Sequence, residues 1–227
     1  MSKPSMMSLA ELALRGPSAA VAAARKKIPF TRPAVPDEVL RLASQLVAAT
    51  PGHRRVVLWT PVDEILNSVG VAANLAQALI ELQHGPVLLV DANSRRPTLH
   101  TQFGRDLEPG LVGVLRNNVK LSDALCPTAD PELTVLPAGA HRSESSLMAS
   151  ADIGCIFEEV RKGFQYTVLQ TPPYFAYVDA TLLAARADGV VIVAKSGKTR
   201  KAQLNQIKRE LEAVNAHLVG VALVEER

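Results

Sequence analysis

The chain is short of the residues on which several common classes of protein depend. Its 227 residues include two cysteines, Cys126 and Cys155, with neither CxxC spacing nor a cluster of histidines beside them. We therefore expect two small side chains in a reducing compartment, and no metal site. No uninterrupted apolar run approaches the roughly 18 residues of a membrane-spanning helix. Any contact with a membrane is expected to be made through a partner or through the protein surface.

An excess of one charge is also missing. The sequence has 25 basic and 22 acidic residues, which gives a formal net charge of +3. Domains dedicated to nucleic-acid binding concentrate basic residues far more strongly, so we expect no nucleic-acid partner. With 48% hydrophobic residues, the chain suits one well-buried α/β domain and a tail, and is too short for two ordinary domains.

The composition divides the chain near residue 35. Residues 1–35 combine Met, Ser, Ala and Pro with a basic group at Arg25, Lys26 and Lys27. This composition is typical of a flexible leader. Residues 36–227 are predicted to form the single domain, beginning with a helix after Pro36.

From residue 56 onward, short apolar runs alternate with helical patterns. Continuous apolar strands indicate burial on both faces, so we expect a mostly parallel sheet with helices on each side. In such sheets ligands bind beyond the carboxyl ends of the strands, where Thr60, Asp91 and Gln170 would meet. The predicted strands are 56–60, 87–91, 133–136, 166–169, 189–194 and 218–224, and the predicted later helices are 70–82, 144–162, 179–187 and 199–214.

Several short segments, taken together, carry a family resemblance. They are Val87-Leu-Leu-Val-Asp-Ala-Asn-Ser-Arg-Arg-Pro97, Phe103-Gly104, Glu108-Pro-Gly-Leu111, Leu133-Thr-Val-Leu-Pro-Ala-Gly139, Leu147-Met-Ala-Ser150, Thr171-Pro-Pro173, Asp179-Ala180 and Ala187-Asp-Gly-Val-Val-Ile-Val193. In these segments the chain resembles the cytoplasmic domain of bacterial tyrosine kinases of capsule and exopolysaccharide synthesis. That family belongs to the deviant-Walker P-loop ATPases, which include the partition and division-site ATPases. The resemblance extends from about Glu38 to Val224 and implies a P-loop NTPase-like fold.

The resemblance implies a phosphate-binding loop in the turn at 60–72, which keeps the family's length. Such a loop needs glycines whose backbone N–H groups wrap the phosphates, a lysine for the β and γ phosphates and a hydroxyl for magnesium. Here the lysine position is Ser68, the hydroxyl position is Val69, and the glycine positions are Ile65 and Asn67. All four are replaced. This predicts a solvated strand-to-helix turn with lost ATP binding, and residual ATP binding is the alternative.

The acidic positions of the site are altered as well. Asp63 and Glu64 place like charge where a polyphosphate would lie, while Gln170 stands where the family has a magnesium-linked carboxylate. Asn93 replaces a second carboxylate, so Asp91 alone remains. Asp91 is either a residual catalytic group or a strand-end cap of the following turn. As a cap, it should tolerate Asp91→Asn at a cost of at most about 1 kcal/mol.

Two further segments are candidates for contacts with other molecules. The family assembles through a helical Glu-x-x-Arg-x-x-Arg motif, of which this chain keeps Glu38 and Arg41, followed by Ser44. These two side chains could meet a neighbouring subunit or form an exposed pair within the helix. Arg95 and Arg96 follow the Asp91 strand, where they could bind a partner carboxylate or a phosphate, or simply be solvated.

The resemblance implies a role in polysaccharide assembly and export. We expect a catalytically inactive cytoplasmic partner of a membrane polysaccharide co-polymerase, peripheral to the inner membrane, without a cofactor and with homo-oligomerisation as an option. The alternative is an active tyrosine autokinase or ATPase that uses Mg-ATP in an unorthodox pose. Against that alternative, the sequence ends Leu223-Val-Glu-Glu-Arg227 without the family's tyrosine cluster. A third class, the positioning ATPases, is disfavoured by Glu108-Pro-Gly-Leu111 and Leu136-Pro-Ala-Gly139.

Overall fold

The structure is a computed structural model that describes residues 34–65, 68–82, 85–140 and 152–225. Most of the predicted leader, the loop position Asn67 and the family segment Leu147–Ser150 lie outside the described residues. The division of the chain at residue 35 therefore stays a prediction.

The described residues form a seven-stranded sheet with the order β3-β4-β2-β5-β1-β6-β7. Every neighbouring pair is parallel except β3 with β4, which is antiparallel. This confirms the mostly parallel α/β sheet, with β3 as the one strand that the apolar pattern did not predict. The strands are β1 (Arg55–Pro61), β2 (Val87–Asp91), β3 (Cys126–Pro127), β4 (Leu133–Leu136), β5 (Tyr166–Gln170), β6 (Gly189–Lys195) and β7 (Leu218–Val224).

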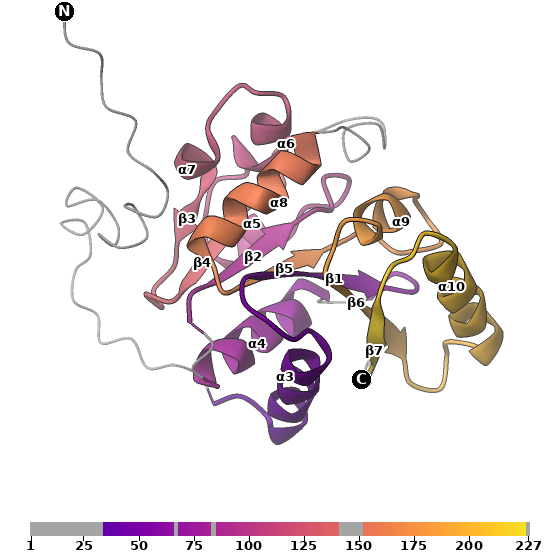
Figure 1. The fold of residues 1–227 in the computed structure, drawn as a ribbon. Helices are drawn as coiled ribbons and strands as arrows, with labels where there is room; N and C mark the ends of the chain where they lie inside the picture. The colour runs from indigo at the N-terminus through magenta and orange to yellow at the C-terminus, as the bar shows by residue number, and fades with distance from the viewer. Residues whose placement is uncertain (1–33, 66–67, 83–84, 141–151, 226–227) are drawn as a thin grey trace, which may run out of the picture.

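Helices cover both faces of the sheet (Figure 1). On one face lie α3 (Asp37–Ala49) and α4 (Ser68–Glu81), and on the other lie α8 (Asp152–Gly163), α9 (Asp179–Ala184) and α10 (Lys201–Ala213). Three short helices that the sequence did not predict are α5 (Leu99–Gln102), α6 (Gly110–Leu115) and α7 (Leu121–Ala124). Each spans at most six residues, which is too short for a helical apolar period to stand out.

The central strand β1 shows why its sequence is continuously apolar. Val57 and Trp59 pack with α3 and α4, whereas Val56 and Leu58 pack in the opposite core. Successive side chains of a strand point to opposite faces, so a strand buried on both sides has no polar position to alternate. Every β1 residue from Val56 to Pro61 is buried.

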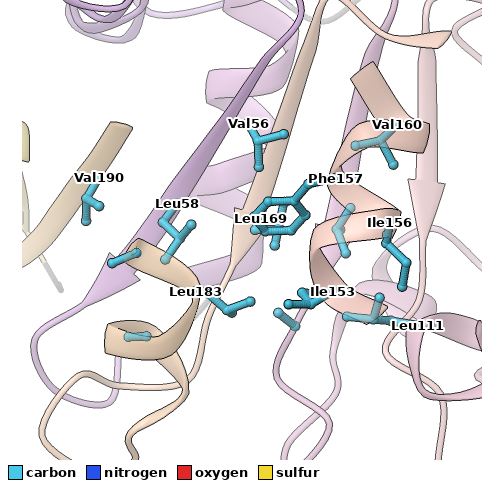
Figure 2. Close-up of a cluster of buried hydrophobic side chains, with 14 of the residues drawn as sticks. Val56, Leu58, Leu111, Ile153, Ile156, Phe157, Val160, Leu169, Leu183 and Val190 are labelled. Atoms are coloured by element: carbon cyan, nitrogen blue, oxygen red, sulfur yellow. The ribbon is translucent and has the colours of Figure 1, made fainter. Parts of the chain in front are cut away.

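Helix α8 shows the corresponding pattern for a helix. Its buried residues Ile153, Ile156, Phe157 and Val160 follow the spacing of an amphipathic helix. Figure 2 shows these side chains facing the sheet, in the same cluster as Leu169 of β5. Within the part of the chain that the structure describes, no helix combines the length and apolar character needed to cross a membrane.

The amino end of the sheet carries a cluster of ion pairs around Asp188, which directly precedes β6. Its Oδ2 accepts hydrogen bonds from the backbone N–H of Val56 at 2.7 Å and from Nη2 of Arg161 at 2.9 Å. Its Oδ1 lies 3.4 Å from Nη1 of Arg55. This one carboxylate therefore joins β1, α8 and β6.

Candidate functional site

The carboxyl ends of three neighbouring strands meet at the candidate site. Asp91 of β2 is in register with Gln170 of β5, which is in register with Trp59 of β1, and Thr60 follows Trp59. Beyond these strand ends lies a pocket of about 600 Å³. Its described lining residues are Pro61, Glu64, Ile65, Ser68, Val69, Asn93, Arg96, Thr98, Thr101, Gln102, Gln170 and Pro173.

Asp91 is completely buried and is held by backbone amides. Its Oδ1 accepts a hydrogen bond from the N–H of Asn93 at 2.9 Å, and its Oδ2 accepts from the N–H groups of Thr98 at 2.9 Å and Leu99 at 3.1 Å. Burial raises the pKa of this carboxyl above its ordinary value, and the three amides partly oppose that rise. In this arrangement Asp91 fixes the turn that leads into α5, as a strand-end cap does.

The bonds of Asp91 change one expectation from the sequence. Both carboxylate oxygens accept, whereas the expected mild effect of Asp91→Asn assumed that one acceptor would suffice. An asparagine amide keeps one acceptor and places N–H donors at the other position, opposite backbone donors. We therefore expect this substitution to cost more than the sequence alone indicated.

The altered phosphate-loop positions have distinct surroundings at the start of α4. The Val69 side chain is buried in the core between α4 and the sheet. Ser68 lines the pocket, and its Oγ lies 3.5 Å from Nε2 of Gln170. Gln170 is only 4% exposed, and its Nε2 also donates to the carbonyl oxygen of Thr171 at 2.9 Å. The structure thus brings Ser68 and Gln170 together and packs Val69 in the core, from which it also borders the pocket.

The second of the predicted site amides, Asn93, is engaged by its own loop. Its Oδ1 accepts a hydrogen bond from the backbone N–H of Arg96 at 3.2 Å. The Oγ1 atoms of Thr60 and Thr171 lie 3.0 Å apart, which links the ends of β1 and β5. Among the described residues, no group of three or more His, Cys, Asp or Glu side chains is arranged to hold a metal ion.

The two neighbouring arginines point to different partners. Nε of Arg95 lies 3.7 Å from Oδ2 of Asp179, and its guanidinium lies 4.1 Å from the centroid of the Tyr177 ring. Nη1 of Arg96 lies 3.4 Å from Oε1 of Glu64, and both of these side chains are mostly exposed. Arg96 thus lines the pocket, whereas Arg95 contacts the segment that leads into α9.

The predicted assembly residues lie on the surface of α3, remote in sequence from the pocket. Glu38 and Arg41 are both exposed, and the structure places no ion pair between these two described side chains. The pair within the helix, one of the two interpretations left open by the sequence, is therefore not formed in this structure.

Some pocket residues were not predicted from the sequence. Thr98, Thr101 and Gln102 come from α5 and the residue before it. They join the pocket because Asp91 holds the start of this helix at the end of β2. Asn93, Ser94 and Pro97, which are residue types favoured in turns, were the local signal of a turn there.

The arrangement of strands and helices defines the class of protein. A mostly parallel sheet with helices on both faces, and a strand-to-helix turn beside the central strand end, is the P-loop NTPase-like fold. No protein-family model matches the chain. The kinase domain of Escherichia coli tyrosine kinase ETK superposes with a TM-score of 0.77 at 21% identity, covering 92% of this chain and 87% of that domain. This likeness shows the fold.

Sequence comparison gives the relation within that class. The putative tyrosine-protein kinase EpsB of Ralstonia solanacearum is 30% identical over 183 residues, which cover 80% of this chain and 24% of EpsB. The tyrosine-protein kinase YwqD of Bacillus subtilis strain 168 is 33% identical over 153 residues, which cover 67% of this chain and 64% of YwqD. The chain is a homologue of the bacterial tyrosine kinases. It matches about a quarter of the length of EpsB and just under two thirds of YwqD.

Proposed function

We propose that this protein is a catalytically inactive relative of the bacterial tyrosine kinases that acts by binding in exopolysaccharide or capsule synthesis and export. Its relation to EpsB and YwqD and the family segments quoted above support the polysaccharide role. The chemistry of the strand-end pocket supports the inactivity.

The observation that carries the proposal is the surroundings of Val69. In the family this position supplies the hydroxyl for magnesium, but here it holds an apolar side chain that is 3% exposed and packed in the core. The lysine and carboxylate positions hold Ser68 and Gln170, both uncharged. Because Mg²⁺ is bound through carboxylates and phosphates, and polyphosphates need placed cations, these residues do not fit Mg-ATP. No cofactor is therefore part of the proposal.

The buried tyrosine next to the pocket, Tyr174, also suits an inactive protein. Tyr174 is 5% exposed, and its hydroxyl accepts a hydrogen bond from Oγ1 of Thr181 at 3.2 Å. Burial raises the pKa of Tyr174 to about 12. A buried hydroxyl that keeps its proton is a poor acceptor for a phosphoryl group, so we expect no autophosphorylation there.

The proposed partner is the cytoplasmic segment of a membrane polysaccharide co-polymerase, which would hold this protein in the cytoplasm at the inner membrane. Glu38 and Arg41 are exposed on one face of α3 and are proposed to contact a second copy. Arg95 and Arg96 lie at the carboxyl edge of the sheet and are proposed to contact partner carboxylates, in exchange for Asp179 and Glu64.

The test is deletion of the gene with measurement of the amount and chain length of surface polysaccharide. We expect the amount or chain length of the polysaccharide to change, and complementation by the unmodified gene to restore it. Unchanged polysaccharide with misplaced chromosomes or division sites would instead favour a positioning protein. Phosphotyrosine on the purified protein after incubation with ATP alone would favour the active kinase.

A further inference from the structure

The two edges of the sheet are built differently. One edge is β3, which consists of Cys126 and Pro127. Pro127 has no N–H group to donate, and its carbonyl oxygen accepts a hydrogen bond from Nη2 of Arg105. A short strand, a proline and a charged side chain are means by which proteins keep a sheet edge from pairing with another chain. The β3 edge is therefore closed to further strands.

The opposite edge is β7, which lacks these features. Its seven residues, Leu218–Val224, are apolar throughout and include neither a proline nor a charged side chain. β6 pairs with it on one side, and no described strand pairs with it on the other. Its register irregularity lies near its amino end, so residues 220–224 pair regularly with β6. A long, apolar and uncharged edge strand is the kind that pairs with another strand.

The backbone of β7 directs hydrogen-bonding groups to this open edge. On the β6 side, the carbonyl oxygen of Val224 accepts a hydrogen bond from the N–H of Ser196 at 2.9 Å. Backbone groups of successive residues in a strand point to opposite edges, so those of Leu223 and Val221 point away from β6. Figure 1 shows β7 at the end of the sheet, between α3 and α10, and it contacts both helices.

The side chains at the open edge are apolar and exposed. Val221 is 41% exposed and Leu223 is 70% exposed. The two side chains lie on the same face of the strand, because they are two residues apart. Around Gly220, no described atom beyond its chain neighbours lies within 4 Å of the position that a Cβ would take, so another backbone can approach closely. A second strand would cover these side chains and pair the backbone groups.

The strand that fits this edge best is a second copy of β7. Without charged residues, the strand brings no like charges together when it meets itself. An antiparallel pair centred on Val221 places the small residues Gly220 and Ala222 opposite each other. It also brings the amino end of one strand beside the carboxyl end of the other, so that His217 lies near Glu225 of the other copy. Both of these side chains are exposed, and a protonated imidazole and a carboxylate attract each other.

We infer that two copies of this chain pair through β7, antiparallel about a twofold axis, and form one continuous sheet. Because the β3 edge is closed, each copy offers one edge, so the assembly stops at two chains instead of growing into a fibre. The inference goes beyond the proposed function and does not depend on the loss of ATP binding. It is also separate from the contact proposed for Glu38 and Arg41 on α3.

The chain offers a matched pair of exposed valines for the test. Val221→Lys places two like charges opposite each other at the proposed axis, and lysine on an edge strand opposes pairing. Val178→Lys makes the same change at the residue before α9, which is 57% exposed and lies outside the sheet. Only the first change should affect the pairing of two copies.

The experiment uses the purified full chain over a wide range of protein concentration. Sedimentation velocity measures the dissociation constant of the dimer, and hydrogen–deuterium exchange with mass spectrometry follows the peptide that contains β7. We expect a dimer in which this peptide exchanges more slowly above the dissociation constant than below it. We expect Val221→Lys to raise the dissociation constant by roughly tenfold or more, and Val178→Lys to leave it unchanged.

Exchange in the unmodified protein decides the outcome even if Val221→Lys fails to fold, which circular dichroism would show. A protein that stays monomeric at every concentration would overturn the pairing. A dimer in which β7 exchanges at one rate above and below the dissociation constant would also overturn it, because the copies would then meet elsewhere. A dimer that is lost in Glu38→Lys and kept in Val221→Lys would place the contact on α3 and overturn the pairing through β7.

Discussion

At the amino end of the sheet, the Asp188 carboxylate is met by the Arg55 and Arg161 side chains and by the N–H of Val56. At the carboxyl end, the buried amide of Gln170 bonds to its neighbours through nitrogen only, and its oxygen is buried without a partner among the described residues. The charged side chains of the first end form ion pairs with one another, although Nε of Arg55 is buried without a partner among the described residues. The polar groups of the second end are neutral apart from Asp91 and border a pocket. The first end stabilises the fold, and the second is where function is expected.

The largest effect on stability is expected at the amino end. Asp188→Asn removes the charge that faces Arg55 and Arg161, which are both mostly buried. Arg161 keeps Glu158 as a second partner, so the loss comes mainly from leaving Arg55 without its counterion and should lower the free energy of unfolding by about 2 kcal/mol. Urea denaturation followed by circular dichroism measures this loss.

Glu212→Gln is the control for that variant, because Glu212 forms an exposed pair with Lys208 across one turn of α10. Its removal should cost less than about 0.5 kcal/mol. Equal losses in the two variants would mean that the Asp188 cluster is no more important than an ordinary surface pair.

The next largest effect is expected at Asp91, whose two carboxylate oxygens accept three backbone hydrogen bonds at the carboxyl end. Asp91→Asn should cost about 1–3 kcal/mol in urea denaturation, because the new amide opposes backbone N–H donors at one of its two positions. Polysaccharide output should survive at matched protein level if Asp91 acts only as a cap. Loss of output in a folded, normally abundant variant would make Asp91 a working site residue.

The contribution of Asp91 to stability should also depend on pH, by a smaller amount whose sign follows from its raised pKa. Burial raises the pKa of Asp91 in the folded protein above its ordinary value of 3.8. The folded state therefore holds this proton to a higher pH than the unfolded chain does. The stability contributed by Asp91 is greatest below pH 3.8 and falls as the pH rises through the folded-state pKa. The advantage of the wild type over Asp91→Asn, measured by urea denaturation, should shrink over that range; a growing advantage would contradict the raised pKa.

A still smaller effect on folding is expected at Gln170. Gln170→Met loses the bond to the Thr171 carbonyl oxygen but also removes a buried oxygen without a partner. These two changes oppose each other, so the unfolding free energy should change by less than about 1 kcal/mol. A loss as large as that of Asp188→Asn would show that the two ends of the sheet do not differ in the way described.

The smallest effect on folding is expected on α3, which belongs to neither end. Glu38→Lys changes an exposed charge, so stability should move by no more than about 0.5 kcal/mol. If α3 contacts a second copy, the new charge beside Arg41 should weaken self-association, since like charges at an interface are unfavourable. Sedimentation velocity of both proteins at equal concentration measures this. Unchanged association would remove α3 from the proposed interface.

The sequence predicted the sheet and its longer helices because burial on two faces leaves a continuous apolar pattern. It could not predict α5, α6 and α7, which are fixed by tertiary contacts such as the bonds from Asp91 to Thr98 and Leu99. It predicted that Asp91 and Gln170 meet at one edge, because both end strands. Arg95 pairs with Asp179, and Arg96 pairs with Glu64. Each partner is far from its arginine in the sequence, so no local pattern predicts that the two arginines point in different directions.

The central claim is that the strand-end pocket does not hold Mg-ATP. Isothermal titration calorimetry of the purified full chain with Mg-ATP tests it most directly, with an ATP-binding P-loop protein titrated from the same nucleotide stock as the positive control. We expect no measurable binding, because Ser68, Val69 and Gln170 supply neither the cation, the hydroxyl nor the carboxylate that the ligand needs. A magnesium-dependent dissociation constant in the low micromolar range, which corresponds to about −8 kcal/mol, would contradict the account.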